Sequence, residues 1–206
     1  MKRIIIFILT LLLCSMLLTF ASCDSDNAPQ LQNQIAFAEL SDEQLDILGL
    51  IHGGNVSIFE FNLDEAFTKF TLWIDVYRYG EFIETLFAME LPYFLHPSTD
   101  TPYSGRLAIM QNTPIDLHAW DFAIQSGNAT ARHYFRNEID SDAYGVSTAP
   151  HIIEPMDIRL GDHIILMART FGSGIQLSPL EMQTILTDTE IIAHFPLVYI
   201  VRVRFS

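Results

Sequence analysis

Residues 197–205 read Leu-Val-Tyr-Ile-Val-Arg-Val-Arg-Phe, and this stretch decides the fold class. Apolar and polar side chains alternate along it with a period of two. The apolar positions are Tyr199, Val201, Val203 and Phe205, and the polar ones are Arg202 and Arg204. Successive side chains of a strand point to opposite faces of a sheet, so this pattern predicts a strand with one buried face.

The same alternation recurs at residues 58–63, 70–77, 107–109, 120–124 and 163–169. Gly80 interrupts it between residues 73 and 87, which predicts a hairpin there. No strand is followed by a long helical pattern, which argues against a parallel α/β sheet. We therefore predict an all-β fold, an antiparallel β-sandwich or jelly-roll-like domain with one or two short helices. The expected core is Phe61, Leu72, Ile74, Trp120, Phe122, Leu166, Val201 and Val203.

Two segments carry helix signals. Ser41 and Gln44 have the spacing of a capping box, and Leu45 and Leu48 follow at helical spacing. Residues 178–181 begin Ser-Pro and place Glu181 at the third helical position, a second N-terminal signature. In residues 163–169, Ile164, Leu166 and Ala168 alternate with the other four residues. We expect those three on one face and Met167 and Arg169 on the opposite one.

Charge restricts the partners of the chain. Its 206 residues hold 25 Asp and Glu against 11 Lys and Arg, a formal net charge of −14. Nucleic-acid binding needs a basic footprint, so no nucleic acid is expected as a partner. The same negative net charge argues against binding to an anionic lipid surface or wall polymer, unless divalent cations bridge the chain and that surface.

The first residues resemble an export signal. Lys2 and Arg3 precede a run from Ile4 to Phe20 that is apolar apart from two threonines and one serine. Residues 21–23 read Ala-Ser-Cys, which resembles the lipobox of bacterial lipoproteins. The resemblance implies cleavage before Cys23, acylation of its thiol with a chain such as palmitate, and an anchor in the lipid bilayer of the cell membrane.

That interpretation divides the chain into a lipoprotein signal peptide (residues 1–22), a flexible polar tether (23–34) and one β-sandwich domain (35–206). An uncleaved signal anchor formed by residues 4–22 is the alternative. Either reading places the domain on the extracytoplasmic face, because Lys2 and Arg3 hold the N-terminus in the cytoplasm. The whole arrangement also resembles small uncharacterised all-β lipoproteins of Gram-positive bacteria, which implies no catalytic residues.

Motifs for known chemistry are incomplete. The seven histidines are scattered without the spacing of a zinc site, and no motif implies a cofactor. His52-Gly53-Gly54 resembles the oxyanion loop of lipases, but no Gly-x-Ser-x-Gly elbow accompanies it. Glu138, Asp140 and Asp142 form a candidate for weak calcium binding on an external loop, although the sequence departs from an EF-hand. Their other reading is a solvated acidic turn.

Aromatic residues supply the candidate binding site. Trp73, Asp75 and Tyr77 alternate with the aliphatic face of residues 70–76, and Tyr79 continues their row. Exposed aromatics on a sheet suit the binding of a sugar or a protein, whereas a covering helix or loop would make Trp73 a core residue. We expect a binding module for an envelope protein or glycan. The alternative is an envelope hydrolase whose site is assembled only by the fold.

Overall fold

The computed structural model describes residues 33–52, 56–64, 67–92, 103–111, 119–126, 129–136, 146–150, 152, 154–172 and 189–206. Contacts divide the chain into residues 1–30 and 31–206, and all described residues belong to the second unit. Cys23, the calcium candidate at residues 138–142 and the helix expected at 178–181 lie outside the described residues. Within the described part, neither helix is long and apolar enough to cross a membrane.

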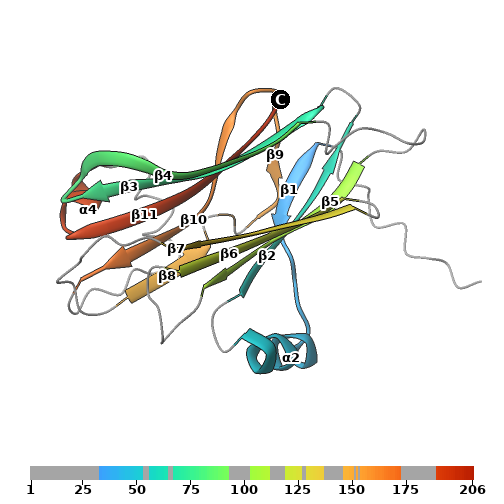
Figure 1. The fold of residues 1–206 in the computed structure, drawn as a ribbon, viewed down its shortest axis with the longest axis horizontal. Coiled ribbons are helices and arrows are strands. Elements are labelled where there is room, and N and C mark those ends of the chain that lie inside the picture. The colour runs from blue at the N-terminus through green and yellow to red at the C-terminus, as the bar shows by residue number, and fades with distance from the viewer. Residues whose placement is uncertain are drawn as a thin grey trace, which may run out of the picture. The chain divides into compact units, whose positions relative to one another are not determined.

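The strands form two antiparallel sheets packed as a sandwich, which confirms the predicted fold class (Figure 1). The first sheet has the order β7 (Ala129–Arg136), β6 (Ala119–Ser126), β5 (Tyr103–Gln111), β2 (Val56–Leu63), β1 (Gln34–Phe37) and β9 (Met156–Asp157). The second has the order β4 (Glu81–Pro92), β3 (Lys69–Arg78), β11 (Leu197–Phe205), β10 (His163–Phe171) and β8 (Val146–Pro150). The stretch that decided the fold class, β11, is therefore the central strand of the second sheet.

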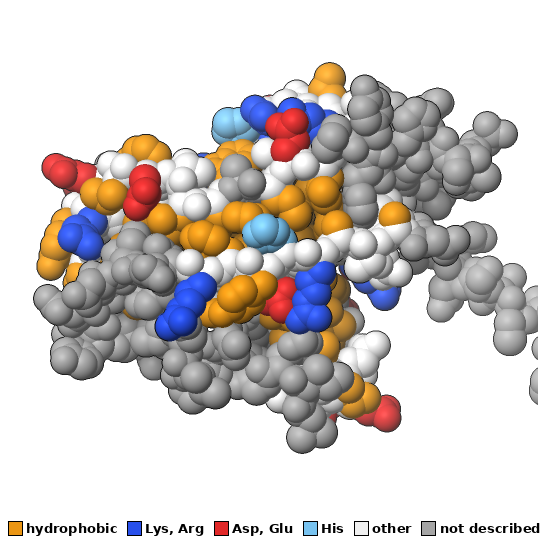
Figure 2. All heavy atoms as spheres, in the orientation of Figure 1, with side chains coloured by type: hydrophobic (Ala, Val, Ile, Leu, Met, Phe, Trp, Pro, Cys, Tyr) orange, Lys and Arg blue, Asp and Glu red, His pale blue; other side chains and the backbone are white. Residues whose placement is uncertain are grey.

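The core lies between the two sheets and contains every residue predicted for it. Its centre is aromatic, because the ring of Phe205 on β11 lies 5.3 Å from that of Phe61 on β2 and 5.4 Å from that of Phe70 on β3. On the side where the edge strands β4 and β7 lie, hydrophobic side chains reach the surface between the sheets (Figure 2). There Phe87 on β4 stacks on Phe122 at 5.4 Å and contacts His133 on β7 at 4.7 Å.

Helix α2 (Asp42–His52) begins with the predicted capping box. The amide of Gln44 donates to the hydroxyl of Ser41 at 3.3 Å, and the amide of Ser41 donates to the side-chain oxygen of Gln44 at 2.9 Å. The helix contacts β2 of the first sheet, and Leu45 and Ile47 are about half exposed. A short helix that the sequence did not predict, α4 (Thr189–Ala193), precedes β11.

The hairpin of β3 and β4 turns at Tyr79 and Gly80, as expected from the glycine. Both residues have positive φ angles, 50° and 85°, as in the two-residue turns that match the twist of antiparallel strands. Strand β3 therefore ends at Arg78, and the side chain of Tyr79 is 62% exposed. The expectation that Tyr79 continues the row of Trp73 and Tyr77 is wrong, because Tyr79 belongs to the turn.

A β-bulge in β10 overturns the alternation expected for residues 163–169. Its register against β11 steps from Ile165 opposite Arg202 to Met167 opposite Val201, which leaves Leu166 as the extra residue. Beyond the bulge the faces exchange. Ala168 packs in a cluster on the outer face of the sheet, while Met167 and Arg169 point into the sandwich.

Candidate functional site

The candidate binding residues lie on the outer face of the second sheet. Strand β3 presents Thr71, Trp73, Asp75 and Tyr77 there, because its aliphatic residues fill the core. Neighbouring β11 presents Val198, Ile200, Arg202 and Arg204 on the same face. The register sets Tyr77 opposite Val198 and Trp73 opposite Arg202. This face therefore changes along the strands from apolar to polar.

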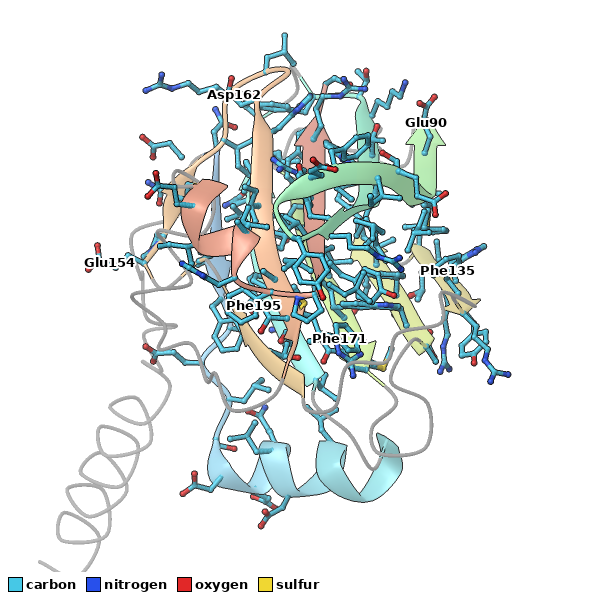
Figure 3. The ribbon with its side chains drawn as sticks, turned by 90° about the vertical axis from the view of Figure 1, so that its left-hand side faces the viewer. Glu90, Phe135, Glu154, Asp162, Phe171 and Phe195 are labelled. Atoms are coloured by element: carbon cyan, nitrogen blue, oxygen red, sulfur yellow. The ribbon has the colours of Figure 1, made fainter. Side chains whose placement is uncertain are left out.

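The apolar half is covered. Ile192 of α4 and the following Phe195 pack on Ala168, Val198 and Ile200, and Tyr77 lies partly buried against them. Figure 3 shows Phe195 beside α4, with Asp162 and Glu90 toward the opposite end of the strands. We call the remaining part, formed by Thr71, Trp73, Asp75, Arg202, Arg204 and His163, the Trp73 face.

Asp75 holds the Trp73 face together. Its carboxylate accepts hydrogen bonds from the indole N–H of Trp73 at 3.2 Å and from the hydroxyl of Thr85 at 2.8 Å. The Nε atom of Arg202 lies 2.8 Å from one of the same oxygens in an ion pair. The residue is only 8% exposed. Asp75 therefore fixes the position of other side chains, rather than standing free for a ligand.

Trp73 and Tyr77 are both partly exposed, so neither is a full core residue. His163, which is exposed on β10, meets the Trp73 ring edge to face at 5.0 Å between centroids. The terminal Nη2 of Arg202 lies 3.4 Å from the hydroxyl oxygen of Tyr77. The indole is thus held by a hydrogen bond and a ring contact while part of its surface remains open to solvent.

The sequence indicated Trp73, Asp75 and Tyr77 but missed Arg202, His163 and Thr85. The signal for Arg202 was present, since the alternation of residues 197–205 placed it opposite the core. What the sequence could not give was the pairing of β11 with β3, which joins residues more than a hundred positions apart. That pairing is what brings Arg202 to Asp75.

A second polar group lies inside the sandwich. Arg169 is fully buried, and its guanidinium carbon lies 5.5 Å from the ring centre of Trp120 and 5.4 Å from that of Phe171. Nearby, the hydroxyl of Thr148 donates to the side-chain oxygen of Gln111 at 3.0 Å. Burial and packing between rings give this group a structural role. The bulge in β10 is the reason that the sequence pattern missed it.

Within the described ranges, no three His, Cys, Asp or Glu side chains gather as a metal site. The chain matches no family model, and neither the curated proteins nor the solved structures contain a match to it. Its class is therefore defined by the fold alone, as an antiparallel β-sandwich protein.

Proposed function

We propose that the chain is a membrane-anchored binding module on the extracytoplasmic face of the cell envelope, and that the Trp73 face is its binding site. The observation that carries the proposal is a partly exposed tryptophan whose indole N–H is fixed by the buried carboxylate of Asp75. Helix α4, which covers the apolar half of this outer face, lies away from the end of the sheet marked by Asp162 and Glu90 (Figure 3).

A fixed aromatic surface suits recognition. Tryptophan offers a large contact area with few rotatable bonds, so little side-chain entropy is lost when a ligand is bound. Here the hydrogen bond to Asp75 and the contact with His163 already restrict the indole before any ligand arrives. Preorganisation of this kind raises affinity without requiring further contacts.

The binding proposal is tested by co-sedimentation of the full chain, purified in mild detergent, with isolated Gram-positive cell-wall fragments. We expect the wild-type chain to sediment with the fragments and Trp73→Ala to remain in solution. Tyr134→Ala is the matched control, because Tyr134 is 55% exposed on β7 of the other sheet. Equal sedimentation of wild type and Trp73→Ala would contradict the assignment of the site.

The anchor is tested separately. Acylation of Cys23 should label the chain when cells are fed a radioactive fatty acid, and Cys23→Ala should abolish the label. Equal label in both chains would contradict acylation at Cys23. A mass that includes residues 1–22 would instead support the uncleaved signal anchor.

A further inference from the structure

Arg204 has no ion-pair partner among the described residues, unlike the nearby cations Lys69 and Arg202. Across the sheet it is opposite Thr71 on β3 and His163 on β10. Its Nε atom is buried and makes no hydrogen bond. No ion pair between described residues includes Arg204. The hydroxyl oxygen of Thr71, a residue only 9% exposed, is likewise buried and makes no hydrogen bond. Two adjacent buried polar groups without partners are uncommon in a folded protein.

The surrounding cations are already neutralised. Lys69 pairs with Glu90 at 2.6 Å, and Arg202 pairs with Asp75 at 2.8 Å. The charge of Arg204 is therefore left over on this face, although the chain as a whole carries a net charge of −14. The overall charge argued against an anionic partner, but this local arrangement offers an anion a place to bind.

We propose that Arg204, Thr71 and His163 bind the carboxylate of an acidic saccharide whose sugar ring lies on Trp73. This inference rests on the proposed function and specifies its ligand. The guanidinium can donate two parallel hydrogen bonds to a carboxylate. The Thr71 hydroxyl can donate a third once the side chains that bury it move aside for the ligand. Diagonal neighbours across strands, such as Arg204 and Trp73, lie about 7–8 Å apart, which suits a sugar ring with its attached carboxylate.

The site at Arg204 suits a ligand with a singly charged anionic group better than one with a doubly charged group. Arg204 supplies one unneutralised positive charge, and the acidic remainder of the chain repels a higher negative charge. This favours a sugar carboxylate over a phosphate monoester. A flat indole beside the cation further favours a ligand with a ring over a small inorganic anion.

The test measures binding of tetragalacturonate, its fully methyl-esterified form and inorganic phosphate to the full chain in mild detergent. Wild type should bind the acid at least tenfold more tightly than the ester, a difference of about 1.4 kcal/mol, because the ester cannot make the charge-assisted hydrogen bonds to Arg204. Arg204→Gln should lose this preference. The matched control is Arg106→Gln, because Arg106 is exposed and pairs with Glu60 on the other sheet.

The outcomes separate this inference from the proposed function. Equal binding of acid and ester, or an unchanged preference in Arg204→Gln, would overturn the carboxylate site. In either case, the proposed function would still be supported if the wild-type chain sedimented with cell-wall fragments and Trp73→Ala did not. Competition by phosphate at the same concentration as tetragalacturonate would overturn the choice of a saccharide. Failure of the wild type to bind tetragalacturonate would overturn the inference directly.

Discussion

The two tryptophans of the chain contact similar types of residue but differ in their exposure to solvent. Trp120 lies between the sheets at 0% exposure, with Arg169 against its ring and Phe122 stacked at 6.1 Å. Trp73 lies on an outer face, partly exposed, opposite Arg202 and in contact with His163. Each region combines an indole, an arginine and a second ring.

This difference indicates that exposure to solvent, rather than residue type, separates a stabilising role from a binding role. Around Trp120, stability comes from the burial of apolar surface, and the guanidinium of Arg169 is enclosed between aromatic rings. Around Trp73 the polar contacts hold an exposed surface in one position. The first region should therefore govern the free energy of unfolding, and the second should govern binding.

The largest difference is expected between the two alanine substitutions. Trp120→Ala should lower the free energy of unfolding by about 3–5 kcal/mol, the range for deleting a buried tryptophan. Trp73→Ala should lower it by less than about 1.5 kcal/mol, the area-based value for a side chain that is only partly buried. Urea unfolding followed by circular dichroism measures both. Equal losses would mean that Trp73 is a core residue and that the comparison fails.

A smaller difference is expected between the two arginines. Arg169→Ala should cost about 2–4 kcal/mol of unfolding free energy, because it empties a fully buried site between Trp120 and Phe171. Arg202→Ala should cost about 1–2 kcal/mol, since Asp75 keeps its bonds from Trp73 and Thr85. The control is Arg106→Ala, an exposed pair expected to change stability by about 0–1 kcal/mol. A loss for Arg202→Ala greater than that for Arg169→Ala would reverse the assignment.

The smallest expected effect is spectroscopic. The chain has two tryptophans, so Trp120→Phe reports Trp73 alone and Trp73→Phe reports Trp120 alone. Iodide should quench the fluorescence of Trp73 several-fold more strongly than that of Trp120, because a charged quencher does not enter the apolar core. Equal quenching in the two variants, with both cooperatively folded, would contradict the difference in exposure.

The fold was predictable because its signals are local. Alternation in residues 197–205 and 70–77 identified both the strands and the face that enters the core. The capping box at Ser41 was equally local. The bulge at Leu166 was not, since an extra residue in a strand leaves no mark in an apolar run, and it reversed the faces of Ala168 and Arg169. The short helix α4 also lacked a clear pattern.

The candidate site was predictable only in part. Trp73 and Tyr77 share a face by strand period alone, and the structure places both there, partly exposed. The role of Asp75 depends on Thr85, which reaches it through the hairpin, and on Arg202, which reaches it through a pairing distant in sequence. The unpartnered pair of Arg204 and Thr71 depends on the same distant pairing.

The central place of β11 bears on the order in which the domain assembles. A ribosome makes residues 197–205 after all the other described strands, yet β3 and β10 meet only through β11. Until this last strand emerges, the β3–β4 hairpin and the β10–β8 pair have no shared neighbour. The second sheet can therefore close only after synthesis of β11, so the β3–β4 hairpin and the β10–β8 pair remain separate until the last strand docks between them.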